Sequence, residues 1–202
     1  MVQDILTSEE CKALMWNMLV DELHNEYGAA GVIGNIICES NCKSDNVQNS
    51  YEKRVGNDST YTNNVNTGIY TVEQFSKDSA GYGLAQWTYH TRKRALYNFM
   101  KTNGFGIADT LGQIKFLISE LKGYKLVWNT LVNAKSIREA SNAVLIHYEK
   151  PASKDSINTQ NYRAQKCQAV YDQFHTGKDN KEEVKELIKQ ISTLLDRLNT
   201  LI

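Results

Sequence analysis

A carboxylate, Glu39, stands near the end of residues 31–41, an apolar, glycine-spaced run that closes on small polar residues. Apolar residues within 32–37 recur at i, i+1, i+4 and i+5, which predicts a helix whose apolar face is buried. A carboxyl group at the buried end of such a helix loses hydration, and this favours its neutral form, as general acid catalysis requires. The same residue could instead cap the helix or form an ion pair at its end. The spacing therefore permits acid catalysis by Glu39 and does not require it.

A second stretch, residues 79–88, combines aromatic, amide and glycine residues in a form that suits a sugar groove. Tyr82 and Trp87 offer flat faces for sugar rings, and Gln86 both donates and accepts hydrogen bonds. Glycines on either side of Tyr82 let the backbone approach a ligand closely. The alternative is a tight β-hairpin whose aromatic side chains belong to the core.

Three patterns carry a resemblance to a known family. They are Gly-Asn-Ile-Ile-Cys-Glu-Ser-Asn at 34–41, Gly-Tyr-Gly-Leu-Ala-Gln-Trp-Thr at 81–88 and Ala-Val-Leu-Ile-His-Tyr-Glu-Lys-Pro at 143–151. In this order they resemble the phage-tail-type lysozymes, a branch of the lysozyme-like superfamily that includes goose-type lysozymes and lytic transglycosylases. The resemblance covers roughly residues 8–174. It implies a mainly α, lysozyme-like α+β fold, in which a small β-hairpin or loop region lines the cleft of a helical domain. It also implies cleavage of peptidoglycan glycan strands with Glu39 as the catalytic acid.

The same resemblance singles out Tyr148, since in lytic transglycosylases a tyrosine from a late helix approaches the catalytic glutamate. The alternative is a core tyrosine whose hydroxyl group is satisfied by a hydrogen bond. We therefore expect Tyr82, Gln86, Trp87 and Tyr148 to contact the substrate.

An ordinary muramidase needs a second carboxylate, either as the nucleophile or as the base that activates water. Asp78 is the preferred residue, because it lies just before the Gly-Tyr-Gly stretch and could reach the same cleft. The other acids considered between the two stretches are Asp45, Glu52, Asp58 and Glu73. If the chain follows its goose-type and transglycosylase relatives instead, Glu39 serves as both acid and base and no second carboxylate acts.

Composition excludes several classes of protein. The chain has 202 residues, 41% of them hydrophobic, and a single proline, which predicts one main domain with a sizeable core. Lys plus Arg and Asp plus Glu both number 23, so no basic excess points to nucleic acid or to an acidic membrane surface. Nothing predicts membrane insertion, and the start of the chain does not look like a signal peptide. We expect synthesis in the host cytoplasm, followed by action on the cell wall after release through a holin-type lesion or as part of a virion.

Four cysteines, Cys11, Cys38, Cys42 and Cys167, are too few and too irregularly spaced for a disulfide-rich scaffold. Buried free thiols are expected. Cys38 and Cys42 could also provide a thiol nucleophile or a pair of metal ligands, but a zinc site needs further His or Cys ligands close by. The sequence thus predicts no metal site and no cofactor.

Capping signals and periodicity predict the helices that position these residues. Thr7 and Glu10 form a capping box before a helix that ends at Gly28, and the next helix follows after a very short turn. Residues 41–78 lack helical periodicity and are expected to form a long loop or small β-region along the cleft. The basic residues 92–94 are expected on a solvated helix face. Later helices are expected over residues 91–102, 110–122, 124–132, 136–150 and 161–174.

The end of the sequence has a different pattern. After a polar break at 175–180, the apolar residues of 181–202 fit the a and d positions of a coiled coil. About three heptads of isolated helix are marginal in water, so this amphipathic C-terminal helix needs a partner. We expect a catalytic domain over residues 1–174, a linker, and a helix that joins copies of the chain into a homo-oligomer.

Three classes of function stay open at this point. The favoured one is a muramidase that cleaves the β-1,4 bond between N-acetylmuramic acid and N-acetylglucosamine in bacterial lysis, with a lytic transglycosylase that uses the same Glu39 as its alternative. The second is a cysteine-dependent peptidoglycan amidase or peptidase that uses Cys38 or Cys42. The third is a non-catalytic virion or wall-binding module. Most of the preference for the first class rests on the resemblance.

Overall fold

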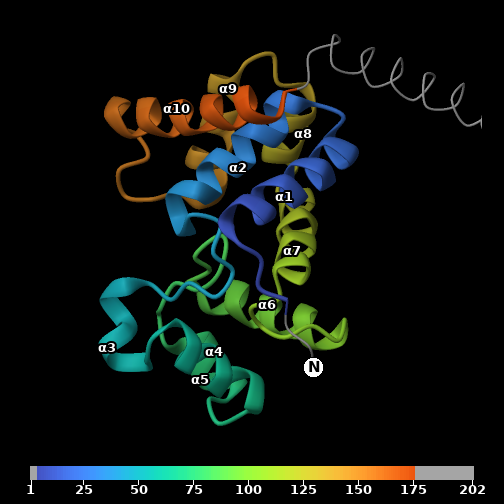
Figure 1. Cartoon of the computed structure of the whole chain (residues 1–202). Helices are drawn as coiled ribbons and strands as arrows, with labels where there is room; N and C mark the ends of the chain where they lie inside the picture. Colours follow the sequence, from blue (N-terminus) through green and yellow to red (C-terminus); the bar gives the residue numbers. More distant parts are fainter. Residues whose placement is uncertain (1–3, 176–202) are drawn as a thin grey trace, which may run out of the picture.

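Helices make up most of the described chain, residues 4–175 of the computed structural model (Figure 1). A 3-10 turn, η1 (Asn49–Tyr51), and a π-helical turn, η2 (Leu145–Glu149), add to them. The mainly α, lysozyme-like fold expected from the sequence is confirmed. The α-helices are α1 (Ser8–Leu23), α2 (Glu26–Ser40), α3 (Glu52–Val55), α4 (Asp58–Thr67), α5 (Val72–Lys77), α6 (His90–Thr102), α7 (Thr110–Gly123), α8 (Lys125–Asn133), α9 (Ile137–Val144) and α10 (Ile157–Phe174).

Extended structure in the described residues is limited to two isolated antiparallel bridges that share Tyr82. Tyr82 pairs with Val47 and with Trp87, and the Tyr82 and Trp87 backbones exchange hydrogen bonds of 3.2 and 3.0 Å. Gly83 adopts a left-handed conformation (φ +72°), which a glycine accepts without strain. The backbone can therefore reverse its direction in a tight turn directly after Tyr82. The small β-hairpin is thus a tight turn with both aromatic side chains fully buried.

The first helix begins as expected and ends earlier than expected. Thr7 and Glu10 form the reciprocal capping box, but α1 stops at Leu23, where His24 takes a left-handed conformation (φ 50°). Asn25 then caps the start of α2 by accepting a hydrogen bond from the backbone N–H of Gly28. The prediction that Gly28 ends the first helix is therefore wrong, because a polar side chain rather than a glycine breaks the chain here.

The region 41–78, expected as a loop or small β-region, contains short helices instead. Asn57 caps α4 with its side chain, and Thr71 and Gln74 form a capping box at the start of α5. Each helix is too short and polar to show a clear period in the sequence, since α4 buries only Tyr61, Thr62 and Val65. Caps rather than periodicity mark these elements.

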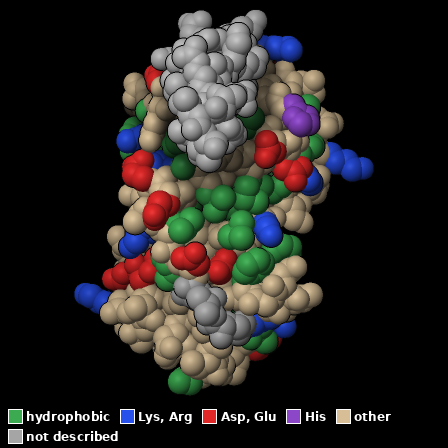
Figure 2. Space-filling view, turned by 45° about the vertical axis from the view of Figure 1, so that its right-hand side comes forward, with side chains coloured by type: hydrophobic (Ala, Val, Ile, Leu, Met, Phe, Trp, Pro, Cys, Tyr) green, Lys and Arg blue, Asp and Glu red, His purple; other side chains and the backbone are tan. Residues whose placement is uncertain are grey.

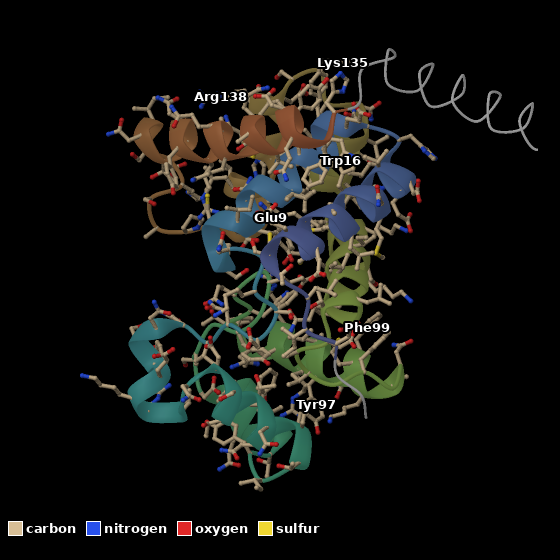
Figure 3. All side chains as sticks on the ribbon, in the orientation of Figure 1. Glu9, Trp16, Tyr97, Phe99, Lys135 and Arg138 are labelled. Carbon is tan, nitrogen blue, oxygen red and sulfur yellow. The ribbon has the colours of Figure 1, made fainter. Side chains whose placement is uncertain are left out.

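The helices form two groups, seen in the upper and lower parts of Figure 1, and α7 runs between them. In the upper group α2 lies at the centre and packs against α1, α9 and α10. In the lower group α5 packs against α6, and α6 packs against α7. Two ring contacts tie these elements together: Trp16 of α1 stacks on Phe174 of α10, and Phe99 of α6 lies on Phe116 of α7, both with centroids 5.5 Å apart. Figure 3 labels Trp16 and Phe99 on their helices.

Burial is extensive along α2. Ten of the residues of α2 are buried, among them Asn35, whose amide donates to the carbonyl oxygens of Gly31 and Ser141 at 2.8 and 3.2 Å. Figure 2 shows one face on which hydrophobic side chains gather in the middle, with acidic side chains nearby. No helix in residues 4–175 has the length and apolar character needed to cross a membrane.

Close packing of α2 on α10 depends on Gly34. A Cβ atom placed on Gly34 would lie 2.5 Å from the backbone N and Cα of Cys167, which cannot move without shifting the helix. We expect Gly34→Ala to lower the free energy of unfolding by roughly 1–3 kcal/mol, the usual cost of overpacking. Gly123→Ala is the control, since nothing lies within 4 Å of its Cβ position. Urea unfolding followed by circular dichroism compares the two, and equal stabilities would contradict the tight contact.

The predicted linker (residues 175–180) and C-terminal helix (residues 181–202) lie outside the described residues, apart from His175. Assembly into a homo-oligomer through residues 181–202 therefore stays a prediction.

Candidate active site

A cleft of about 630 Å³ lies where the two groups of helices face each other. Its walls come from the end of α2, the turn before α3, the tight turn around Tyr82, the start of α6 and the chain after η2. The residues that line it are Glu39, Gln48, Tyr51, Ser79, Ala85, Gln86, Thr88, Tyr89, Arg92, Glu149 and Pro151. Polar, aromatic and acidic side chains thus converge on one opening large enough for sugar rings.

Glu39 occupies the last turn of α2 and faces this cleft. Arg163 of α10 donates to its Oε1 at 2.5 Å and also donates to the carbonyl oxygen of Asn35 at 3.0 Å. The neighbouring Ser40 hydroxyl donates to the carbonyl oxygen of Leu84 at 2.8 Å, which anchors the end of α2 to the opposite wall. Glu39 is therefore fixed in position, and α2 supplies it as the sequence predicts.

A second carboxyl group, Glu149, faces the same cleft. It ends the π-helical turn, after which Lys150 adopts a left-handed conformation and its N–H donates to the carbonyl oxygen of Leu145 at 3.0 Å. Burial and the negative charge of Glu39 raise the pKa of Glu149 well above its usual range. Glu149 lies within the 143–151 pattern, from which the sequence alone predicts no role for it. The available signal is an acidic residue at the end of a helix, shortly before Pro151.

Of the four residues expected to contact substrate, only Gln86 lines the cleft. Its Nε2 donates to the carbonyl oxygens of Asn46 and Gly83 at 3.1 and 3.2 Å. Its backbone is left-handed (φ 44°), a conformation that costs energy in a residue other than glycine. Two tyrosines that the sequence analysis did not select, Tyr51 and Tyr89, also line the cleft.

Trp87 and Tyr148 do not line the cleft but meet beneath it at Glu120 of α7. The Glu120 carboxylate accepts hydrogen bonds from Trp87 Nε1 at 2.9 Å and from the Tyr148 hydroxyl at 2.5 Å. It also accepts from Arg92 Nε at 2.8 Å and Nη2 at 2.9 Å. Burial opposes its charge, yet these donors together hold the pKa of Glu120 below its usual range. Glu120 thereby positions Arg92 on the cleft wall, and substrate contact by Trp87 and Tyr148 stays a prediction.

Asp78 and Tyr82 lie in a buried cluster outside the cleft lining. Asp78 Oδ1 accepts from Lys93 Nζ at 2.6 Å, and the Tyr61 hydroxyl donates to its other oxygen. Tyr82 is fully buried, and its hydroxyl lies 2.6 Å from that of Thr62. The structure therefore does not bring Asp78 together with Glu39 in the cleft. The Asp78 side chain instead has a structural role, as the counter-charge of the buried Lys93.

The basic residues 92–94 are not the solvated face that the sequence suggested. Lys93 is completely buried against Asp78, and burial lowers its pKa to about 8. Arg92 pairs with Glu120, and Arg94, which is more exposed, pairs with Glu73. Three adjacent residues reach three different carboxylates because successive side chains leave a helix in different directions.

All four cysteines are free, and three of them are buried. Cys38 is half-buried, and burial raises the pKa of its thiol, which disfavours the reactive thiolate. Within the part of the chain that the structure describes, no group of three or more His, Cys, Asp or Glu residues is arranged to hold a metal ion.

Comparison with known protein families gives a match that covers most of the chain. The profile of the phage tail lysozyme family matches residues 10–174, which include every residue of the cleft. No curated protein and no solved structure matches the chain.

Proposed function

The chain belongs to the phage tail lysozyme family, a lysozyme-like, peptidoglycan-cleaving family, and we propose that it is a muramidase with Glu39 as its general acid. The bond that it cleaves is the β-1,4 bond between N-acetylmuramic acid and N-acetylglucosamine. The observation that carries this proposal is the position of Glu39, which is held at the wall of a polar cleft by Arg163.

The chemistry requires a proton for the leaving oxygen while positive charge develops on the sugar ring. A sugar chain that fills the cleft displaces water, and loss of hydration favours the neutral, proton-donating form of a carboxyl group. The contact with Arg163 keeps the carboxyl group of Glu39 in one orientation, so the side chain does not have to rotate before the proton is transferred.

Lytic transglycosylase activity is the second candidate. None of the five acids considered as a second carboxylate lines the cleft; among its described lining residues only Glu39 and Glu149 carry carboxyl groups. A transglycosylase uses one residue as acid and base, because an oxygen of the muramic acid itself attacks the reaction centre and no water must be activated.

Product analysis distinguishes the two. Purified peptidoglycan is digested with the full chain, the products are reduced with borohydride, and the released fragments are weighed by mass spectrometry. Reducible muramic acid ends are the expected result, whereas anhydro ends identify a transglycosylase. New amino or carboxyl ends without any glycan cleavage would contradict both and support a cysteine-dependent amidase.

Tyr89 lies between the cleft and a second hollow of about 610 Å³, which shares Ser79, Thr88 and Tyr89 with it. Tyr89 is 63% exposed, so its ring is accessible to a sugar ring in the cleft. We expect Tyr89→Ala to raise KM for long glycan strands by about 3- to 10-fold, the equivalent of one lost ring contact, and to leave kcat nearly unchanged. Tyr162→Ala, which removes another exposed tyrosine from α10, is the control, and the same KM for both would contradict the prediction.

A further inference from the structure

Glu149 has a feature that ordinary packing does not explain: its Oε1 atom is buried and makes no hydrogen bond to any described residue. The residue nevertheless lines the cleft beside Glu39. A buried polar atom without a partner costs about 1–3 kcal/mol, so such an atom in a cleft indicates a partner that arrives with the substrate.

We propose that Glu149 is a substrate-positioning residue, and that its carboxyl group acts in the cleft as a neutral donor and acceptor of hydrogen bonds to the sugar chain. This inference rests on the proposed function, since the ligand is a glycan strand. Hydroxyl and acetamido groups of the amino sugars offer both donors and acceptors to a neutral carboxyl group.

The charges around Glu149 favour its neutral form. Before substrate binds, Glu39 of α2, paired with Arg163, and Glu120 of α7 both oppose a further negative charge on Glu149. Arg92 of α6 and Arg163 of α10 act in the other direction, but each is already paired with a carboxylate, Arg92 with Glu120 and Arg163 with Glu39. Burial of the Glu149 carboxyl group is the largest of these effects, and the acids add to it. A buried carboxyl group beside two other acids and two guanidinium groups that are already paired is poorly stabilised in its charged form.

The position of Glu149 in the fold is also well defined. The π-helical turn places Glu149 one residue beyond Tyr148, whose hydroxyl is held by Glu120 at 2.5 Å. The Arg92 guanidinium lies 4.7 Å from the centre of the Tyr148 ring, which fixes the base of the turn against the cleft wall. Glu149 is therefore presented from a rigid support, as a positioning residue must be.

The decisive comparison is between Glu149→Gln and Glu149→Leu, with Glu139→Gln on the exposed side of α9 as the matched control. Glutamine is neutral and keeps the donor and the acceptor, so we expect kcat/KM on peptidoglycan to stay within about 3-fold of the wild type. Leucine removes both, and loss of one or two hydrogen bonds is expected to lower kcat/KM by about 10- to 100-fold, mainly through KM. If Glu149→Gln is as inactive as Glu39→Gln, Glu149 gives up a proton in the reaction and the neutral positioning role is wrong. If Glu149→Leu matches the wild type, Glu149 has no role at all.

Two further measurements separate this inference from the proposed function. Infrared difference spectra between wild type and Glu149→Gln at neutral pH are expected to show the C=O band of a protonated carboxyl group, and its absence would overturn the neutral state. Binding of a tetramer of N-acetylglucosamine to Glu39→Gln is expected to weaken by about 10-fold on adding Glu149→Leu and to persist on adding Glu149→Gln. If the wild type cleaves no glycan, the proposed function fails; if it cleaves glycan and these two readouts do not change, only the role of Glu149 fails.

Discussion

Replacing Glu39 with glutamine is expected to lower kcat on purified peptidoglycan by about 10²- to 10⁴-fold, the usual contribution of a positioned general acid. Glutamine has the size of glutamate and still offers an oxygen to the guanidinium of Arg163, so the end of α2 keeps its contacts. The lost property is the transferable proton. Release of reducing ends from purified cell walls, measured at matched protein concentration, gives the rate.

Two controls make this result specific. The unfolding curve of Glu39→Gln should match that of the wild type, which excludes a loss of structure as the cause. Cys38→Ser changes the adjacent residue and should leave activity nearly intact, as should alkylation of the wild type with iodoacetamide. Substantial residual activity in Glu39→Gln, or loss of activity in Cys38→Ser, contradicts the assignment of Glu39 as the acid.

Replacing Asp78 with asparagine is expected to lower the free energy of unfolding by roughly 3–5 kcal/mol, because it leaves a buried ammonium group without its counter-charge. The side chains of Asp78 and Lys93 are only 3% and 0% exposed, and Asp78 also accepts from the backbone N–H of Ala80 at 2.9 Å. Glu73→Gln is the control, since it removes a carboxylate that pairs with Lys77 and Arg94 at the exposed surface, where ion pairs contribute little to stability. Urea unfolding of both variants measures the difference.

The same variant tests the role in catalysis that the sequence suggested for Asp78. Under conditions in which Asp78→Asn is folded, its kcat is expected to stay within a few-fold of the wild type. A large fall in kcat with unchanged stability would instead make Asp78 the second carboxylate of the reaction.

Helices with strong local signals could be predicted from the sequence, and those that depend on neighbours could not. The helices α6, α7 and α8 begin and end close to the predicted residues, and α10 ends as predicted but begins at Ile157 rather than at residue 161. Helix α4 was missed because Asn57 caps a segment of polar residues whose burial depends on packing by distant aromatic rings. Sequence periodicity reports burial on one face, so it cannot reveal a short helix that buries few side chains.

The candidate site divides in the same way. Glu39 could be selected because the apolar residues before it recur with a helical period, and Gln86 because it stands among glycines and aromatic residues. Glu149 and Arg163 could not be selected, because each is part of the site only through its interaction with Glu39. Both residues are far from Glu39 in the sequence, so the folded structure is needed to bring them together. Trp87 and Tyr148 show the converse: both belong to the site's motifs, yet their polar atoms bind Glu120 under the cleft.

The ion pair between Glu39 and Arg163 also bears on how the protein is made. Its two members are 124 residues apart, and a chain synthesised from its N-terminus acquires α2 long before α10. Until α10 emerges from the ribosome, the face of α2 around Gly34 is uncovered and Glu39 has no guanidinium beside it. Any nascent or prematurely terminated product that lacks α10 thus carries the acid without the group that orients it, and only a chain translated through α10 can assemble the complete site.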